Sequence, residues 1–491
     1  MSQLKKPVIL LFLTIISATH ASPGEVHDIV DYGARPDRPR FDSSDSLLRA
    51  WAAACESTGS PTVSVPAGDF LVHQATFAGP CKSSEITVRI GGTLVAPSGY
   101  GGESWIVFDN VEGLSVYGGT IDGRGGALWA CKAAGGRHCP AGATSLKIMN
   151  SKDVVLSGLT SVNSERFHVV IHGCEHVTVH GVRISAAGSS PNTDGIHVQM
   201  STDVTITAAS IRTGDDCVSI GPGTTNLWIE QVVCGPGHGI SIGSLGKEYE
   251  EKGVENVTVK TTVFTGTENG LRIKTWGRPS QGFVKGVVFE NSIMQNVHNP
   301  IIIDQNYCPD HRGCPDKNSG VRISEVTYSD IHGSSATPVA VNFDCSASNP
   351  CTGIGLQNIK LTYGGAAAES CCKHADGEAS AVSEGLYPAF NSRCQNPVAR
   401  DNARLLTTYL PFLVAVATVS SLSLLLDASL VFSRKAVILD GFLEEQRRSK
   451  SRIRWASGRR CGGRRDQPES QPWPGGALVD GGAGHSGARI N

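Results

Sequence analysis

The sequence predicts an all-β protein, built as a single-stranded parallel β-helix in which each coil of chain adds one strand to a stack. Three observations lead to this prediction. Polar clusters recur at a near-constant interval, with Asp194, Asp216 and His238 successively 22 residues apart. Short strands of alternating apolar residues recur with them. The 491-residue chain also holds 57 glycines and shows almost no helical periodicity, as expected for many tight corners.

The predicted strands form two series, most of them bounded by Gly, Asn, Asp or Ser. The first series covers residues 168–172, 195–198, 217–220, 239–242 and 270–273, and the second covers 177–179, 204–206, 227–229 and 257–259. The pattern continues to about Leu361. A β-sandwich is the alternative architecture, and the steady interval disfavours it.

A short helix is predicted before the coils. Asp42 is its expected N-cap, and the apolar residues that follow at helical spacing are Leu47, Leu48, Trp51, Ala52 and Cys55. An open end of a β-helix invites pairing with other chains, so we expect this helix to cap it.

Residues 1–21 have the three regions of a secretory signal: Lys5 and Lys6, the apolar run from Val8 to Ile16, and a cleavage site after Ala21. Export to an oxidising compartment would favour disulfides among the 15 cysteines. The expected pairs are Cys55–Cys81, Cys217–Cys234, Cys308–Cys314, Cys345–Cys351 and Cys372–Cys394. No Cys/His spacing resembles a zinc motif, so no metal or other cofactor is expected. Asn256 begins a glycosylation sequon.

The chain changes character after the main domain, which we place at residues 22–400. Residues 409–432 are almost wholly apolar, residues 446–465 hold nine arginines or lysines, and glycine and proline dominate the remainder. One interpretation is a membrane span with a basic flank, giving a membrane-anchored protein. Asp427 argues against that span. We favour the alternative that residues 401–491 are a disordered or doubtful tail, and expect a secreted monomer.

The charge distribution limits the kind of partner. The formal net charge is −2, and residues 401–491 carry 13 basic and 8 acidic residues, which leaves residues 1–400 at −7. This balance argues against a nucleic-acid binder. An acidic polymer would have to be held by a few placed cations in a cleft. Arg272 and Lys274 are the best pair, because alternate residues of a strand point to the same face.

The clustered residues suit cleavage of a glycosidic bond. That reaction needs a protonated acid for the leaving oxygen and a carboxylate that activates water or attacks directly. Where carboxylates crowd together, repulsion raises the pKa of at least one, so that one stays protonated while another is ionised. A nearby histidine would influence which carboxylate holds the proton.

Four segments together resemble the signature of the polygalacturonases, which are pectin-cleaving glycoside hydrolases. They are Asn192-Thr193-Asp194, Gly214-Asp215-Asp216, Gly237-His238-Gly239 and Arg272-Ile273-Lys274. The surrounding sequence is similar to the plant members from about Val26 to Cys394. The resemblance implies a right-handed β-helix and hydrolysis of α-1,4-linked homogalacturonan with inversion. The sequence of residues 299–307 resembles that of the exo-acting plant group, although the sequence as a whole leaves exo or endo action open.

The resemblance also implies a role for each residue. Asp215 is similar to the general acid, Asp194 and Asp216 to the pair that activates water, and His238 to the residue that tunes the acid. Substrate binding is implied for Arg272, Lys274, Asn192 and Tyr307. His168, His172 and His197 are interpreted as ordinary surface or turn residues.

One conflict concerns stereochemistry. Stacking would put Asp194 and Asp216 about one strand spacing apart, roughly 4.8 Å, and so short a carboxylate separation suggests retention of configuration. We follow the resemblance, because Asp215 would point differently and leave room for water between the other two.

Two other functions stay open at this point. A pectate lyase would need calcium held by acids and a base that removes a proton. A non-catalytic pectin-binding β-helix would release no product.

Overall fold

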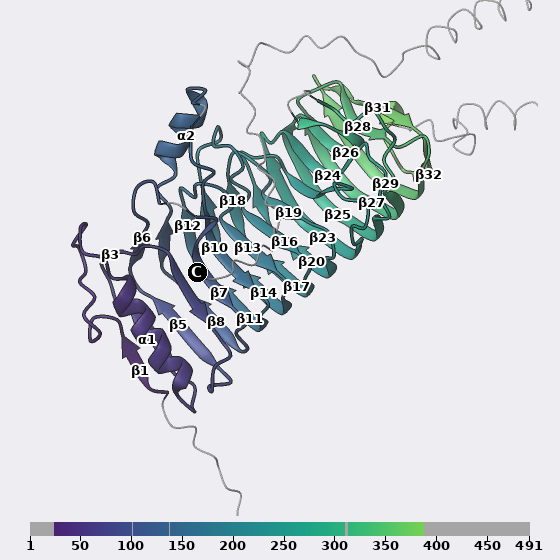
Figure 1. Cartoon of the computed structure of the whole chain (residues 1–491). Helices are drawn as coiled ribbons and strands as arrows, with labels where there is room; N and C mark the ends of the chain where they lie inside the picture. The colour runs from purple at the N-terminus through teal and green to yellow at the C-terminus, as the bar shows by residue number, and fades with distance from the viewer. Residues whose placement is uncertain (1–23, 101, 137, 310–312, 387–491) are drawn as a thin grey trace, which may run out of the picture.

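The computed structural model describes residues 24–386, apart from 101, 137 and 310–312, as a continuous stack of coils (Figure 1). The smaller of its two sheets has eleven strands. In stacking order they are β4 (Ala75–Ala78), β7 (Ser104–Asp109), β10 (Thr144–Met149), β13 (Val169–His172), β16 (Ile196–Gln199), β19 (Val218–Ile220), β22 (Ile240–Leu245), β24 (Asn269–Trp276), β26 (Asn299–Tyr307), β28 (Val339–Asp344) and β31 (Glu369–Lys373).

The larger sheet has 21 strands and covers the other sides of the coils. Its strands are β1 (Val26–Asp28), β2 (Thr62–Val65), β3 (Asp69–Leu71), β5 (Ile86–Ile90), β6 (Thr93–Val95), β8 (Leu114–Tyr117), β9 (Thr120–Asp122), β11 (Lys152–Ser157), β12 (Thr160–Val162), β14 (Glu175–His180), β15 (Arg183–Ser185), β17 (Thr202–Thr207), β18 (Ser210–Arg212), β20 (Thr225–Glu230), β21 (Val233–Cys234), β23 (Val254–Thr265), β25 (Phe283–Val297), β27 (Arg322–Ser335), β29 (Cys351–Tyr363), β30 (Ala366–Ala367) and β32 (Ala375–Ser380).

The predicted parallel stacking is confirmed, and within the described residues only β29 and β30 pair antiparallel. Ile196 lies opposite Val218, and Val218 opposite Ile240, so the 22-residue interval holds across β16, β19 and β22. The next coil is longer than 22 residues, as shown by the pairing of Ile240 in β22 with Leu271 in β24. These inward residues are fully buried and form one row of the core, which the hydrophobic effect stabilises by roughly 2 kcal/mol for each side chain.

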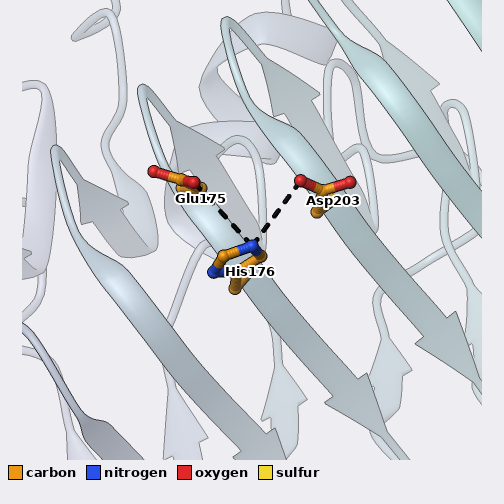
Figure 2. Close-up of side chains that lie close together, drawn as sticks. All are labelled: Glu175, His176 and Asp203. Atoms are coloured by element: carbon orange, nitrogen blue, oxygen red, sulfur yellow. Dashed lines mark ion pairs between the residues drawn. The ribbon is translucent and has the colours of Figure 1, made fainter.

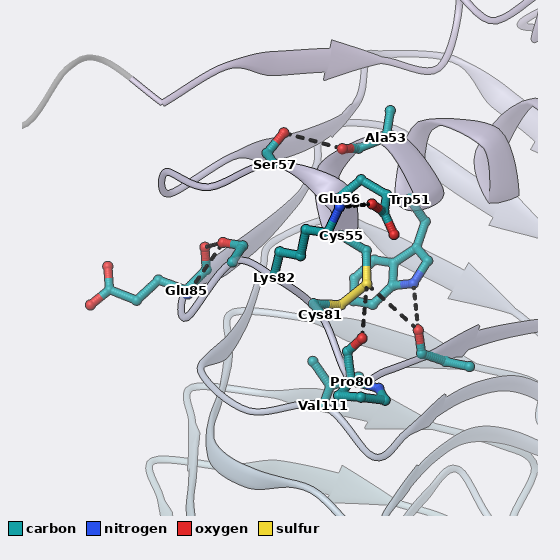
Figure 3. The surroundings of a disulfide bond; sticks show 12 residues. Trp51, Ala53, Cys55, Glu56, Ser57, Pro80, Cys81, Lys82, Glu85 and Val111 are labelled. Atoms are coloured by element: carbon teal, nitrogen blue, oxygen red, sulfur yellow. Dashed lines mark hydrogen bonds and ion pairs between the residues drawn. A yellow bond between two sulfur atoms is a disulfide. The ribbon is translucent and has the colours of Figure 1, made fainter.

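The predicted capping helix is α1 (Ser44–Glu56), which packs over the first coils. The cap residue is Ser43 rather than Asp42, although the Asp42 carboxylate still accepts a hydrogen bond from the Ser44 N–H at 2.9 Å. Ala52 is exposed, contrary to the predicted apolar face. A disulfide between Cys55 and Cys81 ties the end of α1 to the neighbouring coil (Figure 3).

Sequence patterns missed two further helical segments, α2 (Gly126–Ala133) and the short 3₁₀ helix η2 (Glu384–Leu386). The α2 segment projects from the stack in Figure 1 and is closed by an unpredicted disulfide, Cys131–Cys139. Four predicted disulfides are confirmed: Cys55–Cys81, Cys217–Cys234, Cys308–Cys314 and Cys345–Cys351.

The fifth predicted disulfide is wrong in one partner, because Cys371 is disulfide-bonded where the prediction has the adjacent Cys372. Its other predicted partner, Cys394, lies outside the described residues, as do the signal segment and residues 401–491. Within the described part of the chain, no helix is long and apolar enough to cross a membrane.

One corner of the coil carries a ladder of polar side chains, all with left-handed backbones (φ 53–56°). Its members on successive coils are Asp153, His176, Asp203, Asn226 and Asn256. His176 lies 3.2 Å from Asp153 and 3.7 Å from Asp203, and it also faces Glu175 (Figure 2). Asn226 donates to Asp203 at 3.0 Å, and the sequon residue Asn256 donates to Asn226 at 2.6 Å. Short polar residues tolerate this backbone, and their hydrogen bonds link the coils.

Candidate active site

The predicted site residues come from consecutive coils and meet at the outer face of the eleven-stranded sheet. Asp194, Asp216 and His238 each lie two residues before the strands β16, β19 and β22. The Gly195 N–H donates to the Asp216 carbonyl at 2.9 Å, and the His238 N–H donates to the Asp215 carbonyl at 2.7 Å. Hydrogen bonds between coils therefore hold these residues in register, as the 22-residue interval predicts.

Asp216 is a buried carboxylate held by two cations. Its side chain is 1% exposed. It accepts hydrogen bonds from Arg272 at 2.6 Å and from Lys274 Nζ at 2.8 Å. Ser241 lies between them, because it donates to Asp216 and accepts from Arg272 Nε, both at 2.8 Å. Burial alone would raise the pKa of Asp216, but Lys274 and Arg272 outweigh it, so the pKa lies below its usual range.

Asp215 forms a second ion pair with His238. Its Oδ1 lies 3.1 Å from His238 Nδ1, while His238 Nε2 lies 3.2 Å from Glu268. The hydrogen bond and charge of His238 overcome burial and lower the pKa of Asp215. For His238, burial is outweighed by Asp215 and then Glu268, which raise its pKa to about 9. The pair thus keeps one proton between its two members.

Asp194 is the carboxyl group whose surroundings most favour the protonated form. It is 6% exposed, and none of the ion pairs among the described residues includes it. Burial raises its pKa, and the charges of Asp215 and Asp216 raise it further, well above its usual range. The three acids therefore differ in protonation, as the sequence predicts for crowded carboxylates.

Tyr307 and Asn192 lie at the border of this cluster. Lys274 Nζ is 5.2 Å from the centroid of the Tyr307 ring, a cation–π contact. Exposed Asn192 directs its side-chain amide toward the second oxygen of Asp215, at 3.5 Å. All eight predicted site residues thus belong to one cluster.

The glycines of the signature segments let adjacent coils approach. Gly239 has φ +87°, and a Cβ there would lie 2.2 Å from the Asn269 carbonyl oxygen. A Cβ on Gly214 would lie 2.1 Å from the Ser190 carbonyl oxygen. Only glycine leaves room for these contacts, so Gly-Asp-Asp and Gly-His-Gly combine the predicted site residues with a packing requirement.

Residues that the sequence analysis missed also line the site. His197, Ser219 and Ser241 form one outward row on successive strands, and the predicted residue Arg272 continues this row. Their outward position follows from strand alternation within the predicted strands, a signal that was available. Glu268 lies outside every signature segment, and only the folded coil brings it to His238.

The interpretation of the other histidines needs correction. His168 is fully buried, and its Nδ1 lies 2.8 Å from Ser161 Oγ, where burial lowers its pKa to about 3. It is a neutral core residue instead of a surface residue. His197 is half-buried beside Ser219, at 2.8 Å, within the outward row. Burial lowers its pKa, as it does for His172.

The arrangement does not suit a cation. Asp215, Asp216 and His238 place possible ligand atoms within 4.8 Å of one another. However, Arg272, Lys274 and protonated His238 already neutralise both carboxylates and would repel a metal ion. This argues against a calcium-dependent site.

A parallel β-helix that presents a carboxylate cluster beside paired cations suits the class of polysaccharide-cleaving glycoside hydrolases. Residues 55–381 match the family model of glycosyl hydrolases family 28, and the chain belongs to this family. It is 57% identical over 377 residues to a polygalacturonase of Prunus persica, which covers 76% of this chain and 95% of the relative. It is 40% identical over 377 residues to an exopolygalacturonase of Platanus acerifolia, covering 76% and 97%.

Solved structures support the same fold. The polygalacturonase from Erwinia carotovora ssp. carotovora matches with a TM-score of 0.58 and 27% identity, over 74% of this chain and 99% of that chain. The endo-xylogalacturonan hydrolase from Aspergillus tubingensis matches with a TM-score of 0.64 and 23% identity, over 72% and 100%. The expected right-handed parallel β-helix is confirmed.

Proposed function

We propose that this enzyme hydrolyses the α-1,4-galacturonosidic bonds of polygalacturonate by an inverting acid/base mechanism. The observation that carries the proposal is the contact of Arg272 and Lys274 with Asp216, which places two cations beside three carboxylates. One carboxylate neutralises only one of the two cations. The remaining positive charge suits a galacturonate carboxylate. The names of the relatives, polygalacturonase and exopolygalacturonase, support the same substrate class.

In this mechanism His238 holds the proton of the Asp215–His238 pair at rest and passes it to the Asp215 carboxylate, which gives it to the glycosidic oxygen as the bond to C1 breaks. A water attacks C1 from the opposite side. Its proton goes to Asp216, which its low pKa keeps ionised, while Asp194 helps to orient the water. Asn192 and Tyr307 would contact the sugar at the border of the site.

Lys274 and Arg272 would exchange part of their contact with Asp216 for the substrate carboxylate. That exchange frees an Asp216 oxygen at the moment when a base is needed.

Inversion is tested by NMR, which shows the anomer that forms first. Early accumulation of the retained anomer would contradict inversion.

A timed product profile on de-esterified pectin tests the function and the mode together. We expect new reducing ends without calcium and without an unsaturated product absorbing in the ultraviolet. Galacturonate monomer from the earliest times would indicate exo action, whereas a mixture of oligomers whose length decreases with time would indicate endo action. A calcium-dependent unsaturated product would favour a lyase, and no product at all would favour a pectin-binding protein.

We also infer that the protein is secreted to the cell wall, because its disulfides suit an oxidising compartment. Cleavage after Ala21 is read directly by sequencing the N-terminus of the exported protein. Glycosylation at exposed Asn256 is tested by the mass lost on enzymatic deglycosylation.

A further inference from the structure

We propose that Trp276 and Arg278 bind a second galacturonate residue of the substrate, next to the one held by Arg272 and Lys274. The inference rests on the proposed function and extends it along the polymer. Neither residue belongs to a signature segment.

The position of Trp276 follows from strand alternation. Arg272, Lys274 and Trp276 are alternate residues of β24 and share its outer face. Thr275, between them, points inward, is fully buried and shares a 2.7 Å hydrogen bond with Ser319. Trp276 is half-buried, so part of its ring is accessible on the same face as the cation pair.

Side-chain contacts connect the catalytic cluster with Arg278. Beyond the contact of Lys274 with Tyr307, the Tyr307 and Trp276 rings meet edge to face, with centroids 5.3 Å apart. The Arg278 guanidinium carbon then lies 5.3 Å from the Trp276 ring centroid. Cations and aromatic rings therefore alternate from the buried site to solvent.

Arg278 is an available cation in a fixed position. It is exposed, and among the described residues no carboxylate lies within ion-pair distance of it. The contact of its guanidinium with the Lys247 carbonyl oxygen is long, at 3.5 Å. Its backbone is held on both sides, because its N–H donates to Trp276 and its carbonyl accepts from Gly320, both at 2.8 Å.

These groups suit the repeat of polygalacturonate, in which every sugar carries a carboxylate. Once one carboxylate occupies Arg272 and Lys274, the neighbouring sugar needs a second cation and a surface for its apolar C–H face. Arg278 supplies the charge, and the Trp276 ring supplies a rigid amphipathic surface.

The test compares full-length wild type with Arg278→Gln on oligogalacturonates of defined length, from the dimer upward, and on polygalacturonate. At low ionic strength we expect Arg278→Gln to raise KM for the polymer about two- to fivefold, the range for one exposed ion pair, with kcat nearly unchanged. The increase should vanish on the shortest cleaved oligomer, which cannot reach Arg278. It should also shrink in about 0.5 M salt, which screens exposed charges.

Two further variants sharpen the test. Arg278→Lys keeps the charge and should recover part of the lost affinity. Arg183→Gln removes another exposed arginine, from β15 in the other sheet, and its KM should equal that of wild type.

An active wild type whose Arg278→Gln variant shows the same KM at every substrate length would overturn this inference alone. A loss of kcat that is equal at every length would overturn it as well, since it would indicate a structural effect. A wild type that releases no product would overturn the proposed function and this inference with it.

Discussion

At the scale of single residues, the three acids of the site differ because their neighbours differ. Asp194 faces other carboxylates, which raise its pKa, whereas Asp216 faces two cations, which lower its pKa. Asp215 shares one proton with His238. Protonation is thus set by partners up to two coils away, and replacing a partner should move a pH profile without removing any catalytic acid.

Glu268 is the most direct case of such a positioning residue. Its carboxylate contributes to the raised pKa of His238, about 9. Glu268→Gln should lower that pKa, so the Asp215–His238 pair would lose its proton at a lower pH. We expect the alkaline limb of the kcat/KM profile to move to lower pH while the acid limb stays in place. An alkaline limb that does not move in the pH profile of this variant would disprove the role of Glu268.

Asp216 also contributes to stability. Asp216→Asn leaves Arg272 and Lys274 buried with no carboxylate bonded to them, which should cost about 3 kcal/mol in the free energy of unfolding at neutral pH. Because the folded pKa of Asp216 is lowered, this difference should be present above about pH 4 and fade as the pH falls through the folded pKa.

Urea unfolding with the disulfides intact measures this difference. The control is Asp45→Asn, which removes an exposed pair with Arg49 and should change stability by less than about 1 kcal/mol. Equal, small changes in the free energy of unfolding for both variants would show that Arg272 and Lys274 do not destabilise the fold when they lack a carboxylate partner.

At the scale of elements, the turns before β16, β19 and β22 hold the carboxylates and His238 of the proposed site, and glycines let these turns pack. Gly239→Ala combines a left-handed backbone with a Cβ 2.2 Å from a carbonyl oxygen, so we expect a loss of about 3 kcal/mol or more. Gly181→Ala is the matched control, because φ is +63° there but nothing lies within 4 Å.

Gly181→Ala should cost only the backbone term, about 1 kcal/mol. Urea midpoints with a common slope report both values. Similar losses for the two variants would mean that close packing of the coils at Gly239 adds nothing to the backbone strain.

At the scale of the whole molecule, the sequence predicts the site better than its surroundings. Asp194, Asp216 and His238 could be placed in one column because β16, β19 and β22 keep the 22-residue interval. The contact of Arg272 with Asp216 could not be predicted, because the two residues lie two coils apart. Ser241, on the coil between them, bonds to both side chains. The α2 segment was missed because its eight residues lack a clear apolar period, and Cys371 could not be told from adjacent Cys372 by spacing.

The central claim is that stacked coils turn distant acids into one hydrolytic site. The most direct measurement is reducing-end release from polygalacturonate by full-length wild type and by Asp215→Asn, with circular dichroism as the check on folding. We predict that wild type releases reducing ends and that the folded variant loses activity by about 10²–10⁴-fold. Equal release by the two folded proteins would contradict the account.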